Sequence, residues 1–231
     1  MFTLYGNASP NVLKISIALN ELDFPYNWKH VNIWAGQQFR SPIRDLNPLS
    51  KVPILVETNE GGEDTVLFES GAILLYLAEK APHRIMPPDE KERLEALKWL
   101  FVQCANIGPM FGQVTHFAKY APKSDDYALR RYRRQAERLY AVLEDRLSQN
   151  RYLSGDHYSV ADIATFPWVR LHEQHVEQVG PSVLRWLATV ASREAVDAAV
   201  KRHLADVWPS DMAMRDAAQS TDLDTLFPGR A

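Results

Sequence analysis

The sequence predicts an α/β domain followed by an all-helical domain, because its hydrophobic periodicity changes once along the chain. From residue 2 to residue 81, short apolar runs typical of strands alternate with helical segments. The prolines and charges between residues 82 and 88 are typical of a linker, and every long segment after them has helical periodicity. We therefore expect domains at 1–83 and 90–208 and a polar, loosely attached tail at 209–231.

The first domain has the element order β-α-β-β-α. Strand-like runs occur at 2–5, 26–33, 53–56 and 65–68. Helical segments occupy 12–22 and the residues from 71 onward. This is the order of a thioredoxin-like domain.

The second domain carries two clear helix signals. The motif Ser159-x-x-Asp162 resembles a capping box and predicts the start of a buried helix that runs into Trp168. The segment after Tyr127 places apolar and aromatic residues on one helical face. These residues are Leu129, Tyr132, Ala136, Leu139, Tyr140, Leu143 and Leu147.

Length and charge set the broad class. A chain of 231 residues is long enough for one large domain or two modest ones. With 26 basic and 29 acidic residues, the net charge is −3, so we expect neither a nucleic acid nor an acidic membrane surface as a partner. There is no charged-then-apolar leader, and no apolar run approaches the roughly 20 residues of a membrane span.

The cysteine content is minimal. The single cysteine, Cys104, excludes an intrachain disulfide and a cysteine-based zinc site. It lies in an apolar helical segment, so we expect its side chain to be buried and to pack in the core. Together with the composition, this predicts a soluble protein of a reducing compartment, the cytoplasm.

The junction at Glu69-Ser70-Gly71 is the most informative stretch, because it joins an apolar strand to an apolar helix. As the N-cap of that helix, Ser70 would stand before free amides that suit a carboxylate. The neighbouring acid Glu69 suits an ammonium, so an α-amino acid terminus would satisfy both. Earlier in the chain, Pro53 opens another strand and is barred from the interior of its ladder. The backbone of Val52 could therefore stay available to a peptide.

Several short motifs with a defined order and spacing carry a family resemblance. They are Ser9-Pro10-Asn11, Lys51-Val52-Pro53, Glu69-Ser70-Gly71-Ala72-Ile73, Gly155-Asp156 and Ser159-Val160-Ala161-Asp162. Together they resemble a cytosolic glutathione transferase, most closely the Nu class, whose best-described activity is glutathione-dependent disulfide reduction. The resemblance runs from about residue 2 to residue 186, and it implies that glutathione is the co-substrate.

The loop before the first helix is where the resemblance implies the chemistry. Ser9 takes the N-cap position and Pro10 the first helical position. A ligand sulfur at that helix start would meet the positive dipole end, which favours thiolate over thiol. By resemblance, Asn11 contacts the glutathione sulfur and Ser9 stands where the class often has a hydroxyl. The alternative for both is helix capping alone.

The resemblance also implies the remaining glutathione ligands. Gln38 matches a ligand contact, Lys51 could pair with the glycyl carboxylate, and Val52 would bind through its backbone beside a cis Pro53. Gln38 and Lys51 could instead be solvated loop residues. Arg131 aligns with a glutathione-contacting arginine, although a run of arginines is usually a solvated helix face.

Several reactive side chains have a non-catalytic interpretation. Tyr5 ends the first strand and is expected in the core or in a cleft wall. His116, His172 and His175 show no metal-ligand spacing, so we assign no metal. Aromatic residues around a second-substrate pocket could include Phe111, Phe117, Tyr120 and Trp168, although most aromatic residues at helical spacing are simply core.

The favoured function is a glutathione-dependent disulfide reductase that uses the bound glutathione sulfur as the nucleophile. Its partners would be glutathione or oxidised glutathione together with a small disulfide or electrophile. Two alternatives stay open: conjugation of glutathione to electrophiles or hydroperoxide reduction in the same fold, and a non-catalytic glutathione-binding regulatory protein. By resemblance we expect a homodimer.

Overall fold

The computed structural model describes residues 1–121 and 126–218, and its contacts group them into two compact units. The first unit joins residues 1–77 to residues 194–218, and the second comprises residues 78–193. This grouping differs from the predicted ranges, because residues 194–208 were expected in the helical domain and instead pack with the unit that contains the sheet. Residues 219–231 of the predicted tail lie outside the described residues.

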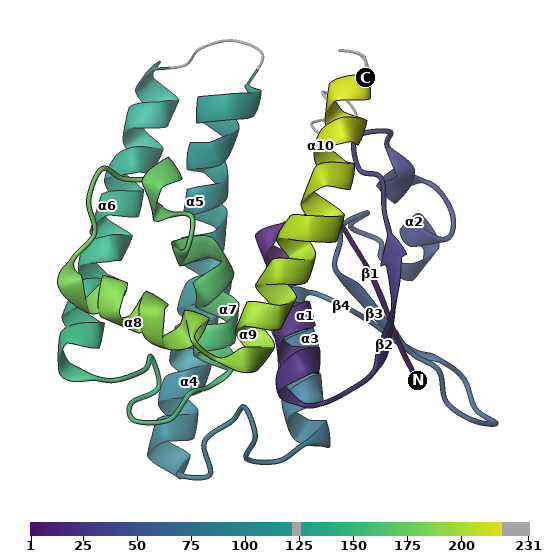
Figure 1. Cartoon of the computed structure of the whole chain (residues 1–231), viewed down its shortest axis with the longest axis horizontal. Coiled ribbons are helices and arrows are strands. Elements are labelled where there is room, and N and C mark those ends of the chain that lie inside the picture. The colour runs from purple at the N-terminus through teal and green to yellow at the C-terminus, as the bar shows by residue number, and fades with distance from the viewer. Residues whose placement is uncertain (122–125, 219–231) are drawn as a thin grey trace. The chain divides into compact units, whose positions relative to one another are not determined.

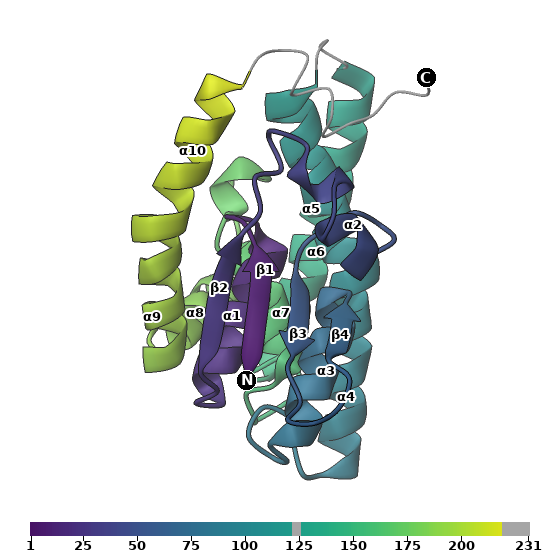
Figure 2. The same ribbon diagram turned by 90° about the vertical axis from the view of Figure 1, so that its right-hand side faces the viewer.

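The first unit is built on a four-stranded mixed sheet with the strand order β2-β1-β3-β4 (Figure 2). β1 is parallel to β2 and antiparallel to β3, which is in turn antiparallel to β4. This arrangement confirms the predicted thioredoxin-like order. The strands are β1 (Phe2–Gly6), β2 (Tyr26–His30), β3 (Ile54–Glu57) and β4 (Thr65–Phe68).

Helices cover this sheet and fill its connections. α1 (Pro10–Glu21) begins with proline at its first position, as predicted, and all its residues from Val12 to Leu19 are buried. The connection from β2 to β3 contains a 3-10 turn, Gln37–Phe39, and the short α2 (Ile43–Leu46). α3 (Ser70–Lys80) follows β4 directly.

The chain then returns to the first unit through α9 (Glu194–Arg202), a π-helical turn at His203–Val207 and α10 (Trp208–Ala217), which follow one another as one long rod (Figure 1). α9 packs on α1, and the side-chain amide of Asn20 donates to the carbonyl of Ala195 at 3.2 Å. The prediction of a loose tail from residue 209 is therefore wrong as far as residue 217, because α10 is a regular helix that buries a side chain.

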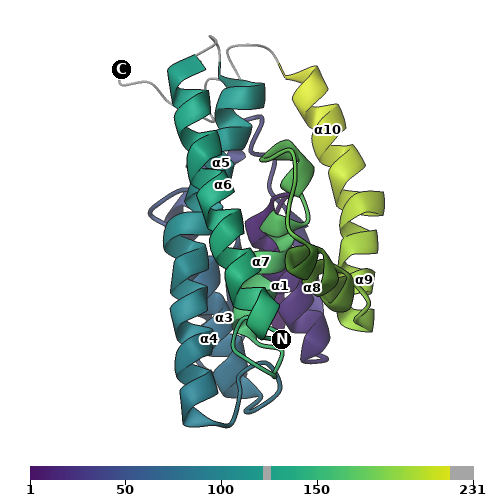
Figure 3. The ribbon, with the colours of Figure 1, turned by 90° about the vertical axis from the view of Figure 1, so that its left-hand side faces the viewer.

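The second unit is helical within the described residues; α4 continues through a turn into α5, and α6 packs alongside α5 (Figure 3). Two π-helical turns, Gln103–Ile107 and His116–Tyr120, flank α5. Its α-helices are α4 (Glu90–Val102), α5 (Gly108–Thr115), α6 (Asp126–Gln149), α7 (Val160–Val169) and α8 (Pro181–Ala191). No helix among the described residues is long and apolar enough to span a membrane.

A fully buried carboxylate organises the start of α7. Asp162 accepts from the backbone amide and hydroxyl of Ser159, and the Ser159 hydroxyl accepts from Ala161. This is the predicted capping box. The other oxygen of Asp162 accepts from the amide of Leu153 at 3.0 Å and from the indole of Trp186 at 2.8 Å. Despite these donors, complete burial raises the pKa of Asp162 to about 6.

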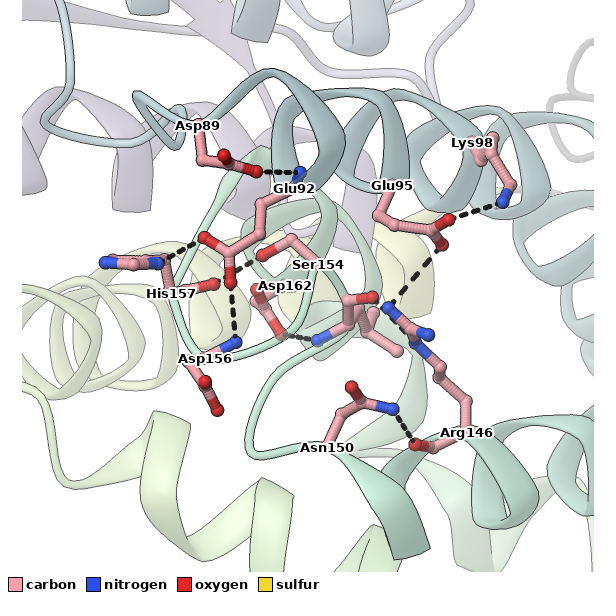
Figure 4. Close-up of polar contacts among 11 residues, drawn as sticks. Asp89, Glu92, Glu95, Lys98, Arg146, Asn150, Ser154, Asp156, His157 and Asp162 are labelled. Atoms are coloured by element: carbon pink, nitrogen blue, oxygen red, sulfur yellow. Dashed lines mark hydrogen bonds and ion pairs between the residues drawn. The ribbon is translucent and has the colours of Figure 1, made fainter.

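A second carboxylate secures the turn that precedes α7 (Figure 4). Glu92 on α4 accepts from the amide of Asp156 at 3.0 Å and also contacts the ring of His157. Beside it, Arg146 on α6 donates to the carbonyl of Leu153 at 3.0 Å. The turn is thus held from two helices of its own unit.

Candidate functional site

The strand register gathers the predicted ligand residues of the first unit at one edge of the sheet. Gly6 at the end of β1 pairs with His30 at the end of the parallel β2. Tyr5 pairs with Ile54 at the start of the antiparallel β3, and Ile54 pairs with Phe68 at the end of β4. The loop after β1, the Val52-Pro53 pair before β3 and the Glu69-Ser70 pair after β4 therefore meet at the same edge (Figure 2).

The loop after β1 presents Ser9 and Asn11 at the start of α1. Ser9 has the extended backbone of an N-cap, with φ −87° and ψ 151°, but its side chain makes no capping hydrogen bond. Its hydroxyl oxygen is buried and has no hydrogen-bond partner in the part of the chain that the structure describes. Capping alone therefore does not account for this serine, and a buried hydroxyl without a partner is suited to a ligand. Asn11 is half-buried in the first turn of α1.

Gln38 lies in the 3-10 turn between β2 and β3 and is only 5% exposed. Its side-chain carbonyl oxygen has no partner among residues 1–121 and 126–218. The turn itself is fixed locally, because the Gln37 side chain accepts the amide of Asn32 at 2.7 Å and Gly36 takes a positive φ of 66°. A solvated loop residue would not be buried in this way, so the carbonyl of Gln38 is a second candidate ligand group.

The segment before β3 is held by a buried asparagine that sequence reasoning missed. The Asn47 side chain donates to the carbonyl of Lys51 at 2.8 Å and accepts from the amide of Leu49 at 2.9 Å. The peptide bond from Val52 to Pro53 is cis, as predicted. Lys51 itself is exposed, which suits a contact with a carboxylate at the rim of a site.

The junction after β4 differs by one residue from the prediction. α3 begins at Ser70, and the amide of Ile73 donates to the carbonyl of Glu69 at 2.9 Å. Glu69 is therefore the N-cap, and the prediction that Ser70 takes this position is wrong, because the sharp bend occurs one residue earlier. Glu69 is exposed and has a φ of 68°, a strained value for a residue with a side chain.

A lysine that sequence reasoning missed lies behind Ser70. Lys14 belongs to the buried part of α1, is 1% exposed, and donates from its ammonium to the Ser70 hydroxyl oxygen at 3.2 Å. An ammonium only donates, so the hydroxyl hydrogen of Ser70 is directed to some other acceptor. The ammonium and the first amides of α3 together favour a carboxylate at this position. The available signal was a lysine within the run Val12 to Leu19, in which Ser16 is the one other polar residue.

An aspartate from α10 also reaches this edge of the sheet. Asp211 accepts the amide of Ala8 at 2.6 Å, and its other oxygen lies 2.6 Å from Nε2 of His30. Burial raises the pKa of the Asp211 carboxyl, while the Ala8 amide and the charge of His30 act in the opposite direction. No local pattern points to this residue, because the contacts cross about two hundred residues of sequence.

Other predicted residues are not part of this cluster. Tyr5 is half-buried and packs against the core formed by Val31, Ile43, Ile54 and Val56, in agreement with its core interpretation. Arg131 is on α6 in the second unit and is exposed, as are its arginine neighbours at 130, 133 and 134. Its contact with glutathione stays a prediction.

The prediction for Cys104 is wrong. Its side chain is exposed, because it occupies the outward side of the π-helical turn after α4, while Gln103 and Ile107 point inward. Cys104 belongs to the second unit and makes a long contact of 3.6 Å with the Gln103 side chain.

The aromatic residues of the second unit divide between core and partly exposed positions. Phe111 is fully buried and stacks on Tyr140 at 4.8 Å, so it is core. His175 is buried against the other side of this pair, 4.5 Å from the Phe111 ring, and its Nδ1 lies 3.2 Å from the Tyr140 hydroxyl. Burial lowers the pKa of His175 to about 4. No group of three metal-ligating side chains occurs within the two described stretches of the chain.

Known families match both parts of the chain. The N-terminal domain of glutathione S-transferases matches residues 4–88, and the C-terminal domain of glutathione S-transferases matches residues 107–194. Among curated proteins, the chain is 40% identical over 211 residues to the disulfide-bond oxidoreductase YfcG of Escherichia coli, covering 89% of this chain and 98% of that protein.

Solved structures agree with these matches. A glutathione transferase from Burkholderia graminis with two glutathione molecules bound per subunit superposes with a TM-score of 0.80 at 40% identity, covering 87% of each chain. A glutathione transferase from Pseudomonas putida with one glutathione disulfide bound per subunit has a TM-score of 0.80 at 36% identity, covering 87% of this chain and 90% of that one. The protein described here belongs to the glutathione S-transferase family.

Proposed function

We propose that the protein is a glutathione-dependent disulfide reductase of the Nu-class type. The thiolate of bound glutathione attacks one sulfur of a disulfide, so that a new sulfur–sulfur bond forms while the old one breaks and its other sulfur leaves as a thiolate that takes up a proton. A second glutathione thiolate then attacks the mixed disulfide and releases the second thiol. The products are oxidised glutathione and two thiols, so electrons and protons balance.

One observation carries this proposal: the strand register brings the Glu69-Ser70 junction, the cis Val52-Pro53 pair and the start of α1 to the same edge of the sheet. The γ-glutamyl end of glutathione would bind at Glu69 and Ser70, and its cysteinyl backbone would pair with Val52. The sulfur would then lie near Ser9 and Asn11. The buried hydroxyl of Ser9, which has no partner among the described residues, supports this assignment.

The outer ligands follow from the same orientation. Lys51 would meet the glycyl carboxylate, and the buried carbonyl of Gln38, which lacks a partner in the described part of the chain, would accept a hydrogen bond from the tripeptide. We also assign Arg131 as a glutathione contact. Weaker binding of glutathione by an Arg131→Ala variant, with unchanged binding by an Arg134→Ala control, would support that assignment.

Activation of the thiol alone would not make an effective reductase. Lowering a thiol pKa from about 8.5 to about 6.5 raises the thiolate fraction at pH 7 roughly 25-fold. With a Brønsted slope near 0.45, the less basic thiolate loses roughly 8-fold in nucleophilicity, which leaves only about threefold. Most of the rate must therefore come from holding the sulfurs in line, where effective molarity is the larger effect.

The relatives support a site of that kind. YfcG of Escherichia coli is a disulfide-bond oxidoreductase, and the Burkholderia graminis structure holds two glutathione molecules per subunit. The Pseudomonas putida structure holds one glutathione disulfide. Two glutathione sulfurs within one subunit are what an in-line exchange between disulfide and thiol needs.

A comparison of substrates tests the proposal. We expect the reduction of bis(2-hydroxyethyl) disulfide by glutathione to be faster than conjugation of a chloronitrobenzene and than reduction of cumene hydroperoxide. A dominant conjugation or peroxidase rate would favour the alternative within the same fold. Binding of glutathione without turnover of any of the three would favour a regulatory binding protein.

We further propose a homodimer in the cytoplasm, where reduced glutathione is supplied. Leu94 and Phe101 are seven residues apart on one face of α4 and are 57% and 64% exposed. The exposed Lys98 lies between them, and large apolar side chains exposed in this way suit a surface that another subunit covers. Sedimentation at micromolar concentration should give twice the mass of 26.4 kDa, and a Phe101→Glu variant should shift toward the monomer.

A further inference from the structure

The helical segment from α9 to α10 is attached to the first unit at several points. At its start, the Asn20 side chain bonds to the carbonyl of Ala195. In its middle, the guanidinium of Arg202 lies over the ring of Tyr26, 5.4 Å from the centroid. Near its end, Asp211 reaches the loop that follows β1. The segment is therefore a fixed part of the unit that holds the proposed glutathione site.

Asp211 joins the ends of two parallel strands. Ala8, whose amide it accepts at 2.6 Å, lies in the loop between β1 and α1, directly before Ser9. His30, whose Nε2 is 2.6 Å away, is the last residue of β2 and pairs with Gly6 in the sheet. The aspartate is 4% exposed, so these two contacts replace most of its hydration.

The chemistry of this contact fixes the direction of the loop. An ionised carboxylate only accepts hydrogen bonds, so the amide of Ala8 has to face α10 for Asp211 to be satisfied. A buried carboxylate that lost either donor would be strongly unfavourable. Asp211 therefore fixes the backbone directly before Ser9, at the start of the helix that carries Asn11.

We propose that Asp211 is a positioning residue for the reacting glutathione sulfur, acting from α10 through the Ala8 amide on Ser9 and Asn11. The inference rests on the proposed function of those two residues. It assigns a role to α10, a segment that forms no part of the glutathione ligands named above. Removal of the carboxylate should displace the sulfur-contacting groups while the Glu69 and Ser70 contacts stay in place.

The test uses three variants of the full chain. Asp211→Ala removes both acceptors. Asp211→Asn keeps an oxygen for the Ala8 amide and an NH₂ group that can donate to His30, so it preserves the geometry without the charge. Asp206→Ala is the matched control, because Asp206 is an exposed carboxylate on the same helical segment. For each variant, disulfide reduction, thermal unfolding and amide hydrogen exchange of residues 6–13 are measured.

We expect Asp211→Ala to lower kcat by about 10-fold or more, with the KM for glutathione changed less than about threefold. Exchange in residues 6–13 should rise by about 10-fold, and Asp211→Asn should restore most of both values. Unchanged loop exchange in Asp211→Ala, or a loss of kcat no greater than in Asp206→Ala, would overturn the proposal. An equal loss of kcat in Asp211→Asn would also overturn it, as would a loss of kcat that the unfolded fraction of the variant explains by itself.

The failure of the proposed function is a separate outcome. In that case, the wild type and Asp206→Ala would both fail to reduce the disulfide. The positioning role is then decided by hydrogen exchange with bound glutathione: protection of residues 6–13 in the wild type and its loss in Asp211→Ala would support the role. Equal protection in the two proteins would overturn it.

Discussion

Two serines stand at helix N-caps in this molecule, and their surroundings differ. Ser159 at the start of α7 shares hydrogen bonds with Asp162 and Ala161. Ser9 at the start of α1 makes no capping bond, and its buried hydroxyl has no partner among the described residues. One hydroxyl takes part in the fold of its own unit, and the other is available for the glutathione contact proposed above.

The same contrast holds for the two regions around these serines. The Asp162 carboxylate receives donors from Leu153, Ser159 and Trp186, none of which changes charge near neutral pH. At the sheet edge of the first unit, the buried oxygens of Ser9 and Gln38 have no partner within the described residues. Polar groups that are satisfied internally stabilise the protein, whereas buried unsatisfied ones reduce its stability.

The largest effect should come from the satisfied region. Asp162→Ala leaves the amides of Leu153 and Ser159 and the indole of Trp186 buried without an acceptor, so the free energy of unfolding should fall by about 3–5 kcal/mol. Urea unfolding of this variant measures the change. Asp145→Ala, an exposed carboxylate on α6, should stay within about 0.5 kcal/mol of the wild type. A small loss of unfolding free energy in Asp162→Ala would mean that the hydrogen bonds of this carboxylate contribute little to stability, which would contradict the contrast between the two regions.

The pH dependence of stability sharpens the same point. Burial raises the pKa of folded Asp162 to about 6, above its ordinary value of 3.8. At a pH between 3.8 and about 6, this carboxyl is ionised in the unfolded chain but still protonated in the folded protein. Its stabilising contribution is therefore fully present at low pH, and it is lost as the pH rises through about 6. Its contribution should fall by up to about 3 kcal/mol from pH 4 to pH 7.

Subtraction isolates this contribution from the other acids. The unfolding free energy of Asp162→Asn is subtracted from that of the wild type at each pH. The difference should decline with rising pH and become flat above about pH 7. A difference that increases with pH would mean that the hydrogen bonds to the carboxylate outweigh its burial.

In the unsatisfied region, the effect should be on activity. Asn11→Ala should lower kcat for disulfide reduction on the order of 100-fold, because it removes a donor to the reacting sulfur. The substitution should not lower the stability of α1, since alanine is a better helix former than asparagine. Asn27→Ala, on the exposed face of β2, is the matched control.

The same kinetics decide which sulfur is the nucleophile. If bound glutathione attacks, Cys104→Ser should retain activity within about twofold, and intact mass should show no glutathione adduct on the protein. An inactive Cys104→Ser beside a fully active Asn11→Ala would reverse the mechanism. The exposure of Cys104 makes this control more informative than a buried cysteine would.

Binding should show a smaller effect. Ser70→Ala removes a hydroxyl that Lys14 orients, so glutathione affinity should weaken by about 1–3 kcal/mol. Glu69→Gln should weaken it as well, through the loss of the ammonium contact. Calorimetric titration measures both variants, and unchanged affinity in both would contradict the assignment of this junction to the γ-glutamyl end.

The smallest effect compares the two serines directly. Ser159→Ala should lower the free energy of unfolding by about 1 kcal/mol, the usual value of a side-chain cap. Ser9→Ala should change stability by less than about 0.5 kcal/mol, since its hydroxyl makes no capping bond, while disulfide reduction falls. Denaturant unfolding and steady-state rates on the same preparations measure both. Equal stability losses would mean that both serines cap.

Local signals predicted much of the fold. The strand at 65–68 and proline at the start of α1 appear as expected, because turn residues and apolar runs are encoded within a few positions. The capping box at Ser159 and Asp162 is likewise present. The strand predicted at 26–33 ends at His30, and the following residues instead form the connection that leads to Gln38.

The remaining errors concern tertiary contacts. Cys104 was expected to be buried because its neighbours are apolar, yet a π-helical turn shifts which side chains face inward at that point. Lys14 gave a weak signal, whereas Asp211 gave none, since its partners Ala8 and His30 are remote in sequence. The predicted ligand residues followed from motifs, but the groups that hold them in place did not.

The discontinuity of the first unit has a consequence for biosynthesis. A chain made from its amino end completes the sheet and α1 early, but α9 and α10 belong to the same unit and follow more than a hundred residues later. At about 5–20 residues per second, the delay from the end of the first part to Asp211 is roughly 7–27 s. During that time the face of α1 that α9 covers and the amide of Ala8 lack their partners. The first unit is therefore complete only after Asp211 has been synthesised.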